Sequence, residues 1–173
     1  MKLQDAEKLW LDQTEEEEVR FALFAEPKLL RRPRTGMKAL AALHFGGYQD
    51  MSGTWITDDR VIWLQMIMSE QPGEGARLLG QICRLASGHG LAICGEPVSL
   101  KPASWDETRH WSGRVDDLII WYLRHDFRVV QSKWRTRVWH VPPGLDLVVG
   151  IELIDKARVP AKTDHPVVEE KHS

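Results

Sequence analysis

The fold of this 173-residue chain is decided by one stretch, Ser69-Glu70-Gln71-Pro72-Gly73-Glu74-Gly75-Ala76-Arg77-Leu78-Leu79. Residues 60–68 before it are mostly apolar, which predicts a central strand covered on both faces. Residues 75–87 carry apolar side chains three and four positions apart, which predicts a helix. Glycines at such a junction allow a ligand to approach the backbone, and the free N–H groups of a first helical turn favour anions. A phosphate-binding loop is one interpretation of residues 69–75, and a plain turn into a buried helix is the other.

A second informative segment lies further along the chain, Trp121-Tyr122-Leu123-Arg124-His125-Asp126-Phe127. An apolar stripe that includes Tyr122 predicts a helix, and Asp116 and Asp117 suit the positive N-terminal end of that helix. A strand is expected to start at Phe127. The position of Tyr122 on the stripe fits a functional side chain and a plain core residue equally well.

The remaining segments predict a first helix followed by several strands. Residues 2–25 are rich in helix-forming residues, with the acidic run Glu15 to Glu18 on a solvated face. Residues 28–35, with three arginines, are expected to form a basic loop, either solvated or bound to an anion. Gly46-Gly47 and Asp58-Asp59 are turn signals that divide an antiparallel meander. The expected strands cover residues 38–45, 53–57, 60–68, 91–100, 127–134, 137–141 and 145–154.

The composition is that of a soluble globular protein, with 43% hydrophobic and 28% charged residues. A net charge of -2 and a pI near 6.4 argue against a broadly basic nucleic-acid-binding protein. Two cysteines, Cys83 and Cys94, do not make a disulfide framework and suit a reducing compartment. No apolar run is long enough to span a membrane, and the N-terminus lacks the apolar core of a signal peptide, so a cytoplasmic protein is expected. Eight tryptophans fit either a well-filled core or an exposed aromatic surface.

The order of these elements over residues 36–141 resembles that of the GNAT superfamily of N-acetyltransferases. The resemblance rests on the glycine loop together with Tyr122 and the strand that starts at Phe127. It implies an α+β fold (GNAT-like α/β) with a central mixed, mostly antiparallel sheet flanked by helices, and with splayed parallel strands at a cofactor cleft. The chain length predicts a single domain, which is placed at residues 1–155, and the polar sequence with Pro160 and Pro166 predicts a loose tail over residues 156–173.

Acetyl-CoA is the co-substrate that the resemblance implies. Its pantetheine arm would lie between the end of the strand at 60–68 and the strand at 91–100, and loop N–H groups would hold its pyrophosphate. The family's loop has Arg or Gln, two residues, Gly, one residue, then Gly or Ala. Glu70 occupies the first position here, or Gln71 does if the loop is one residue shorter, and Pro72 offers no N–H donor. The implied cofactor-binding residues are Met66, Ile67, Met68, Gln71, Gly73, Glu74, Gly75 and Ala76.

The reaction that the resemblance implies is direct transfer of an acetyl group to an amine in a ternary complex. Tyr122 would donate a proton to the departing thiolate. Asp59, Glu70, Glu96 and His44 are the candidates for the base that takes a proton from the amine. The histidines show no metal-ligand pairing, so no metal site is expected.

The implied partner is an amine acceptor, which could be a small amine, a peptide or protein amine, or a modified nucleobase. No membrane partner is expected, the composition argues against nucleic acid, and a homodimer stays open. The alternative is a catalytically silent GNAT-fold protein for binding, structure or assembly, since the loop departs from the family pattern and fold does not fix function. An open cleft at the loop favours the enzyme, whereas a cleft filled by Trp63 or Trp121 favours the binding protein.

Overall fold

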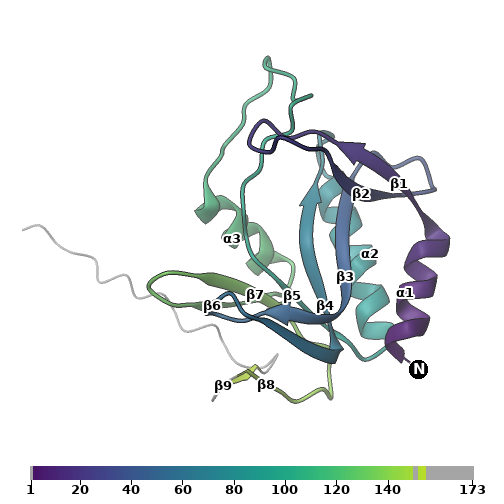
Figure 1. Ribbon diagram of the computed structural model, residues 1–173, viewed down its shortest axis with the longest axis vertical. Helices are drawn as coiled ribbons and strands as arrows, with labels where there is room; N and C mark the ends of the chain where they lie inside the picture. Colours follow the sequence, from purple (N-terminus) through teal and green to yellow (C-terminus); the bar gives the residue numbers. More distant parts are fainter. Residues whose placement is uncertain (1, 150–151, 155–173) are drawn as a thin grey trace, which may run out of the picture.

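The computed structural model describes residues 2–149 and 152–154 and has an α+β fold built on one mixed seven-stranded sheet (Figure 1). Its described helices are α1 (Lys2–Gln13), α2 (Glu74–Gly88) and α3 (Val115–Arg124). The strands of the sheet are β1 (Thr14–Val19), β2 (Lys28–Pro33), β3 (Leu40–Gln49), β4 (Trp55–Met68), β5 (Ala92–Gly95), β6 (Arg128–Gln131) and β7 (Thr136–His140). They are ordered β1-β2-β3-β4-β5-β7-β6, and β4 with β5 is the parallel pair among otherwise antiparallel neighbours. The predicted α+β class with a mixed, mostly antiparallel sheet is confirmed.

Strand β4 forms the centre of the sheet, as the apolar run at 60–68 predicts. Val61, Ile62, Trp63 and Leu64 are all buried. Ile62 and Leu64 belong to a core shared with the helices, whereas Val61 and Trp63 belong to a second core. Successive side chains of a strand point to opposite faces, so the two cores lie on opposite sides of the sheet. A strand without polar residues over this stretch therefore requires cover on both faces.

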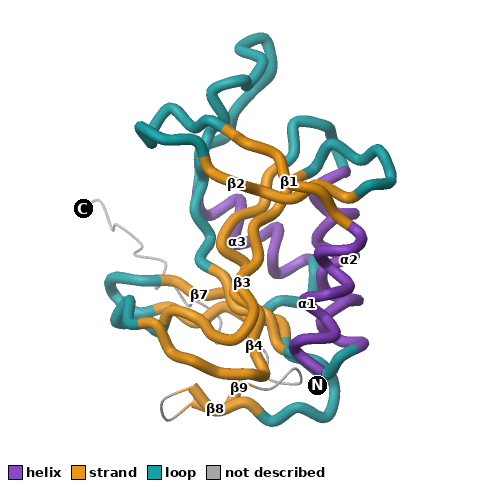
Figure 2. Tube along the Cα trace, turned by 45° about the vertical axis from the view of Figure 1, so that its right-hand side comes forward, coloured by secondary structure: helices purple, strands orange, loops and turns teal. Residues whose placement is uncertain are grey.

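All three described helices contribute to the first core, and α1 and α2 lie side by side in both views (Figures 1 and 2). The apolar spacing of α2 matches the predicted helix at 75–87. The residues that the helices bury in this core are Ala6 and Trp10 of α1, Leu78, Leu79, Ile82 and Ala86 of α2, and Tyr122 of α3.

The N-terminal segment differs from the predicted helix over residues 2–25 and from the predicted basic loop at 28–35. The acidic run Glu15 to Glu18 lies in β1, where Glu15 and Glu16 pair antiparallel with Arg32 and Arg31 of β2. Arg32 contacts Glu15 at 2.8 Å and Arg31 contacts Glu16 at 3.4 Å, so these charges form cross-strand ion pairs. The hydrogen bond from Arg32 lowers the pKa of the Glu15 carboxyl. The helix prediction is therefore confirmed for residues 2–13 and wrong beyond them, and the predicted loop at 28–35 is wrong, because the strand pairing joins residues that are distant in sequence.

The predicted turn at Asp58-Asp59 is wrong as well, because β4 runs through both residues without interruption. The chain reverses at residues 50–54 instead. Oδ1 of Asp50 stabilises that turn by accepting the N–H groups of Ser52 at 2.9 Å and Thr54 at 3.0 Å. The predicted strands at 53–57 and 60–68 are therefore one strand, and the predicted meander is a single hairpin.

The second predicted turn, Gly46-Gly47, lies inside β3, where the register shifts between Phe45 and Gly47. The ring of Trp55 lies directly over Gly47, because a Cβ added there would lie 2.5 Å from that ring. The glycine is needed for this close approach and not for a turn. Strand β3 consequently extends past the predicted end at residue 45.

The later elements follow the prediction more closely. Helix α3 ends where Asp126 adopts a left-handed φ of 67°, which lets the N–H of Phe127 donate to the carbonyl of Tyr122 at 3.1 Å. The strand pair predicted at 127–134 and 137–141 corresponds to β6 and β7.

Two later predictions need correction or fall partly outside the structure. The strand predicted at 91–100 is confined to β5. The strand predicted at 145–154 is an antiparallel hairpin of β8 (Leu147–Val149) and β9 (Glu152–Ile154). The predicted domain limit at residue 155 and the predicted tail at 156–173 lie outside the described residues.

Candidate functional site

The candidate site lies where β4 and β5 separate. Their parallel pairing runs from Val61 opposite Ala92 to Leu64 opposite Gly95 and goes no further. Strand β4 then continues to Met68 beside β3 alone. The edge of β4 that β5 leaves uncovered is available to other hydrogen-bonding groups.

A β-bulge marks the point of separation. Met66 pairs with Ala42 of β3, and Leu64 pairs with Leu43, so Gln65 has no partner in the ladder. A bulge bends its strand and increases the local twist. The chain that follows β5 contains a proline two positions on, which cannot donate to a ladder. The bulge in β4 and the proline after β5 therefore keep the two strands apart.

A small cavity of about 30 Å³ lies in this gap. This volume is sufficient to hold a water molecule. Residues from β4, from the segment after β5 and from α3 line it: Leu64, Gln65, Met66, Ile67, Glu96, Val98, Leu100, Leu118 and Tyr122.

A larger cavity of about 350 Å³ adjoins the small one and shares Ile67, Val98, Leu100 and Leu118 with it. Its volume falls in the range of small-molecule sites. The predicted cofactor-binding residues Ile67, Met68, Gln71, Gly73, Gly75 and Ala76 line it, Met66 lines the small cavity, and Glu74 lines neither. Its other walls come from Ser69, Pro72, Val98, Ser99, Leu100, Pro102, Trp105, Arg109, Trp111, Leu118 and Trp121.

The loop backbone leaves several donors free at the start of α2. Gly73 adopts a left-handed φ of 80°. The N–H of Glu74 donates to the carbonyl of Gln71, and the N–H of Arg77 donates to the carbonyl of Gly73 at 3.2 Å. Within the described part of the chain, the N–H groups of Gly73, Gly75 and Ala76 have no hydrogen-bond acceptor. These donors, together with the dipole of α2, favour an anion in the adjoining cavity.

The two carboxylates of the loop are bound by protein donors. A carboxylate oxygen of Glu74 accepts the N–H of Lys38 at 2.9 Å, and Glu70 accepts the hydroxyl of Ser104 at 2.9 Å. Neither residue lines the large cavity. The negative charge that the sequence puts beside the loop is therefore held by protein donors and does not line the cavity.

Tyr122 is buried, with 4% of its surface exposed, and it lines the small cavity. Its ring makes edge-to-face contacts with Trp121 at 5.0 Å and Phe127 at 5.1 Å between centroids. Burial raises the pKa of its phenol far above the ordinary value, and nearby Cys83 raises it further. Tyr122 is consequently protonated at neutral pH.

Of the four candidate bases, Glu96 alone lines either of the two cavities described here. Asp59 is exposed on β4, and Glu70 is bound to Ser104 as described above. His44 is exposed, and its ring contacts Trp55 at 4.7 Å. The structure thus brings Glu96 and Tyr122 to the same cavity.

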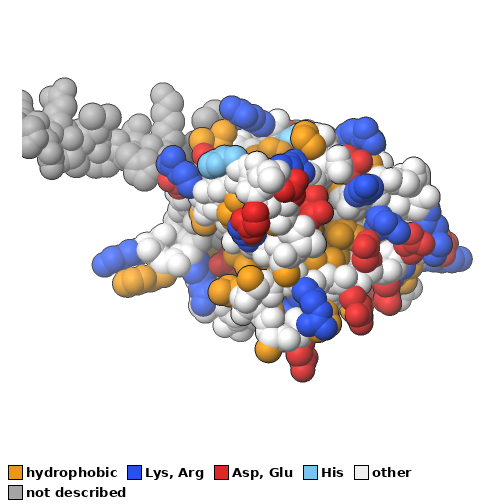
Figure 3. Space-filling model, turned by 90° about the horizontal axis from the view of Figure 1, so that it is seen from above, with side chains coloured by type: hydrophobic (Ala, Val, Ile, Leu, Met, Phe, Trp, Pro, Cys, Tyr) orange, Lys and Arg blue, Asp and Glu red, His pale blue; other side chains and the backbone are white. Residues whose placement is uncertain are grey.

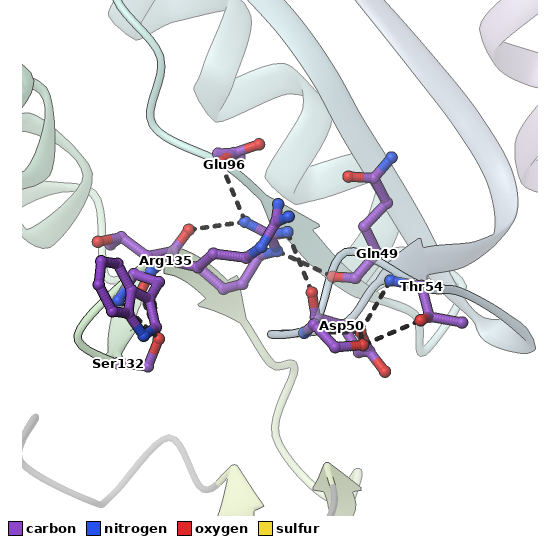
Figure 4. Close-up of polar contacts among 10 residues, drawn as sticks. Gln49, Asp50, Thr54, Glu96, Ser132 and Arg135 are labelled. Carbon is purple, nitrogen blue, oxygen red and sulfur yellow. Dashed lines mark hydrogen bonds and ion pairs between the residues drawn. The ribbon is translucent and has the colours of Figure 1, made fainter.

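Glu96 is held by Arg137, whose Nη1 lies 3.3 Å from its carboxylate. Arg137 is 1% exposed, and its other donors contact the carbonyls of Gln49 at 2.9 Å and Asp50 at 3.1 Å. Figure 4 shows Glu96 on one side of this cluster and Gln49 and Asp50 on the other. The cluster fixes the end of β5 relative to the β3–β4 turn, and so it fixes the position of Glu96.

Sequence reasoning missed Arg137 and one wall of the large cavity. Residues 101–114 are mostly polar in sequence and form neither a helix nor a strand, yet they bring Trp105, Arg109 and Trp111 to the cavity. Two tryptophans within an otherwise polar stretch are the signal that could have identified this wall. An arginine within the strand beginning at 137 carries no comparable signal, because its partners come from β3 and β5.

Other classes of site find no support in the part of the chain that the structure describes. No group of three or more His, Cys, Asp or Glu residues there could hold a metal ion. None of the described helices is both long and apolar enough to cross a membrane. On the face drawn in Figure 3, charged side chains of both signs are interspersed.

No protein-family profile matches the chain, and neither a curated protein nor a solved structure shows a significant match to it. The geometry of the gap between β4 and β5 therefore carries the functional argument.

Proposed function

We propose that the protein is an acyl-CoA-dependent N-acyltransferase that moves an acetyl group from acetyl-CoA to an amine. The gap between β4 and β5, with its two adjoining cavities, is the observation that carries the proposal. Free N–H groups lie at the large cavity, and Tyr122 and Glu96 lie at the small one. This arrangement supports the resemblance to the GNAT superfamily, in which acetyl-CoA lies between two splayed parallel strands.

The residues at the gap fit the two parts of such a donor. A pantetheine arm needs backbone hydrogen-bonding partners, and β4 beyond Gln65 has one edge without a neighbouring strand. A pyrophosphate needs donors, and Gly73, Gly75 and Ala76 offer N–H groups at the start of α2. The large cavity is also open and is not filled by tryptophan: Trp121 forms part of its wall, and Trp63 belongs to the core on the other face of the sheet.

Acetyl-CoA supplies an activated thioester, so that a C–N bond to the amine can form while the C–S bond breaks. The overall reaction requires one proton to leave the amine and one proton to reach the thiolate. We assign the first transfer to Glu96, acting through a water because the small cavity has room for one. We assign the second to Tyr122, which keeps its proton at neutral pH because its pKa is raised.

A catalytically silent binding protein is the second candidate. Tyr122 packs between Trp121 and Phe127 as an ordinary core residue would, and Pro72 removes one donor from the phosphate loop. Such a protein could retain the cavity and bind a ligand without turning it over. Binding and turnover must therefore be measured separately.

The test begins with thermal unfolding and calorimetry of the purified protein with acetyl-CoA. A ligand that binds only the folded state raises the unfolding temperature by mass action. Gly75→Glu should abolish binding, because its side chain would bring negative charge to the donors of α2, and a Cβ at this position already lies 3.4 Å from the Cβ of Ser69. Release of free thiol in the presence of candidate amines then measures turnover.

Gly88→Glu is the matched control, because it adds the same charge at the far end of α2, where a Cβ has nothing within 4 Å. We expect this variant to bind acetyl-CoA like the wild-type protein. Binding without thiol release from any amine would favour the silent protein. No binding at saturating acetyl-CoA would overturn the proposed function.

A further inference from the structure

The segment 101–114 forms an ordered aromatic wall of the large cavity. The rings of Trp105 and Trp111 meet edge to face with centroids 5.0 Å apart. The indole N–H of Trp105 donates to the carbonyl of Arg109 at 3.1 Å, and the Arg109 guanidinium lies 5.1 Å from the centroid of the Trp105 ring. All three side chains are half-buried and line the cavity. An irregular segment with these internal contacts presents flat aromatic surface in a fixed place.

Backbone turns hold this wall in position. The N–H of Trp105 donates to the carbonyl of Pro102 at 3.1 Å, and the N–H of Arg109 donates to the carbonyl of Asp106 at 2.9 Å. The Asp106 carboxylate accepts both the N–H and the hydroxyl of Thr108, at 2.9 Å and 2.7 Å. The segment is further tied to the loop before α2 by the contact between Ser104 and Glu70.

Arg109 is the single charged residue among those that line the large cavity. Among the described residues it makes no ion pair within 4 Å. Its charge is therefore available to an anionic ligand that shares the cavity. Three tryptophans, Trp105, Trp111 and Trp121, contribute apolar ring surface around it.

We propose that this wall binds the nucleotide end of the acyl donor: Trp105 and Trp111 contact a purine ring, and Arg109 contacts a phosphate. Ring systems of nucleobases stack on aromatic side chains, and arginine adds a favourable contact to both ring and phosphate. Arg109 also supplies at the cavity a cation that the glycine loop lacks. The donor is then free acyl-CoA, which carries a nucleotide, and not phosphopantetheine attached to a carrier protein. This inference rests on the proposed function.

The test compares two ligands that share the pantetheine arm and differ in the nucleotide. Acetyl-CoA contains it, whereas 4′-phosphopantetheine, used here as its S-acetyl thioester so that both ligands carry the acetyl group, does not. By calorimetry, Trp105→Leu should weaken the binding of acetyl-CoA at least about tenfold and change the binding of 4′-phosphopantetheine by less than about twofold. Adenosine 3′,5′-bisphosphate, which is the nucleotide end without the arm, should compete with acetyl-CoA. Arg109→Gln should weaken acetyl-CoA binding and make it less sensitive to salt.

Trp134→Leu is the matched control, because Trp134 is 82% exposed and lines neither cavity. It should leave both affinities unchanged. Circular dichroism of each variant checks that the fold is retained.

Three results would overturn parts of the proposal in distinguishable ways. If Trp105→Leu lost affinity equally for both ligands, the wall would have a structural role, and this inference alone would be overturned. Wild-type protein that binds 4′-phosphopantetheine as tightly as acetyl-CoA would also overturn this inference and leave the proposed function standing. Failure of the wild-type protein to bind either ligand would overturn the proposed function and this inference together.

Discussion

The two halves of the apolar stretch of β4 lie in one strand and have different surroundings. Residues 61–64 pair with β3 on one side and β5 on the other, and they are buried on both faces. Residues 66–68 have β3 as their single partner strand, Gln65 is unpaired, and all four residues lie against the cavities. The hydrogen-bond ladder is complete where the sheet needs stability and is interrupted where a ligand would bind. Changes in the first half should therefore affect folding, and changes around the second half should affect function.

The largest effect is expected for Ile62→Ala. Ile62 is fully buried against the helices, so its truncation should lower the free energy of unfolding by about 4 kcal/mol. Ile67→Ala, in the second half, should cost less than half as much, because Ile67 is only half-buried and borders the cavities. Urea denaturation measures both values. Equal losses in the two variants would contradict the division of the strand.

Glu96→Gln should lower turnover by about 100-fold and leave acetyl-CoA affinity within about twofold, because an amide cannot accept the amine proton. Steady-state kinetics and calorimetry on the same preparation separate the two quantities. Asp59→Asn is the matched control, since this carboxylate is exposed and lines neither cavity. Comparable losses of turnover in the control and the test variant would remove Glu96 from its assigned role.

Tyr122→Phe should lower turnover by about tenfold, because the thiolate would then leave without a positioned proton donor. The phenylalanine ring keeps the contacts with Trp121 and Phe127, so the free energy of unfolding should change by less than about 1 kcal/mol. Undiminished thiol release would show that Tyr122 serves packing alone.

The smallest effect concerns pH and the same phenol. Burial raises the pKa of Tyr122 above the unfolded value, which is near 10. The folded state therefore holds this proton more tightly, and the stability that it contributes is complete below pH 10 and is lost as the pH rises above that value. Between pH 9.5 and pH 11, the free energy of unfolding of the wild-type protein should fall by about 1 kcal/mol more than that of Tyr122→Phe, as one titrating group predicts. Urea denaturation across this range compares them. The pKa values of Tyr48 and Cys94 are also raised, but both residues are present in both proteins, so their contributions cancel in the comparison.

The sequence allowed the central elements to be predicted because their signals are local. The apolar run of β4 and the stripes of α2 and α3 are patterns within single segments, and so is the glycine junction at Gly73 and Gly75. The candidate site could be predicted as far as it depends on these segments. Which of four candidate bases shares a cavity with Tyr122 could not, because Glu96 is positioned by Arg137 from another strand.

Two of the errors share one cause, which is that the deciding partner lies in another strand. In the sequence, Glu15 and Arg32 resemble solvated charges; in the structure, the pairing of β1 with β2 brings them into contact. In the sequence, Gly47 resembles a turn residue; in the structure, it allows the ring of Trp55 to lie against the backbone. The missed turn at Asp50 has a different cause: its partners Ser52 and Thr54 are local, but Asp58-Asp59 carries a similar turn signal and was chosen instead.

The unpaired Gln65 also reverses the alternation of side chains along β4. Before it, even-numbered residues such as Ile62 and Leu64 face the helices; after it, Ile67 does, while Met66 and Met68 face a third core. The side chains of β4 therefore alternate in two different phases, one before Gln65 and one after it. Deleting Gln65 would therefore remove the bulge and leave each side chain on its present face, because Leu64 and Met66 would then lie opposite Leu43 and Ala42 as consecutive residues. Pairing Gln65 in a regular ladder would instead put Met66 and Met68 among the helices and turn Ile67 away from them, so the bulge itself decides which side chains reach each core.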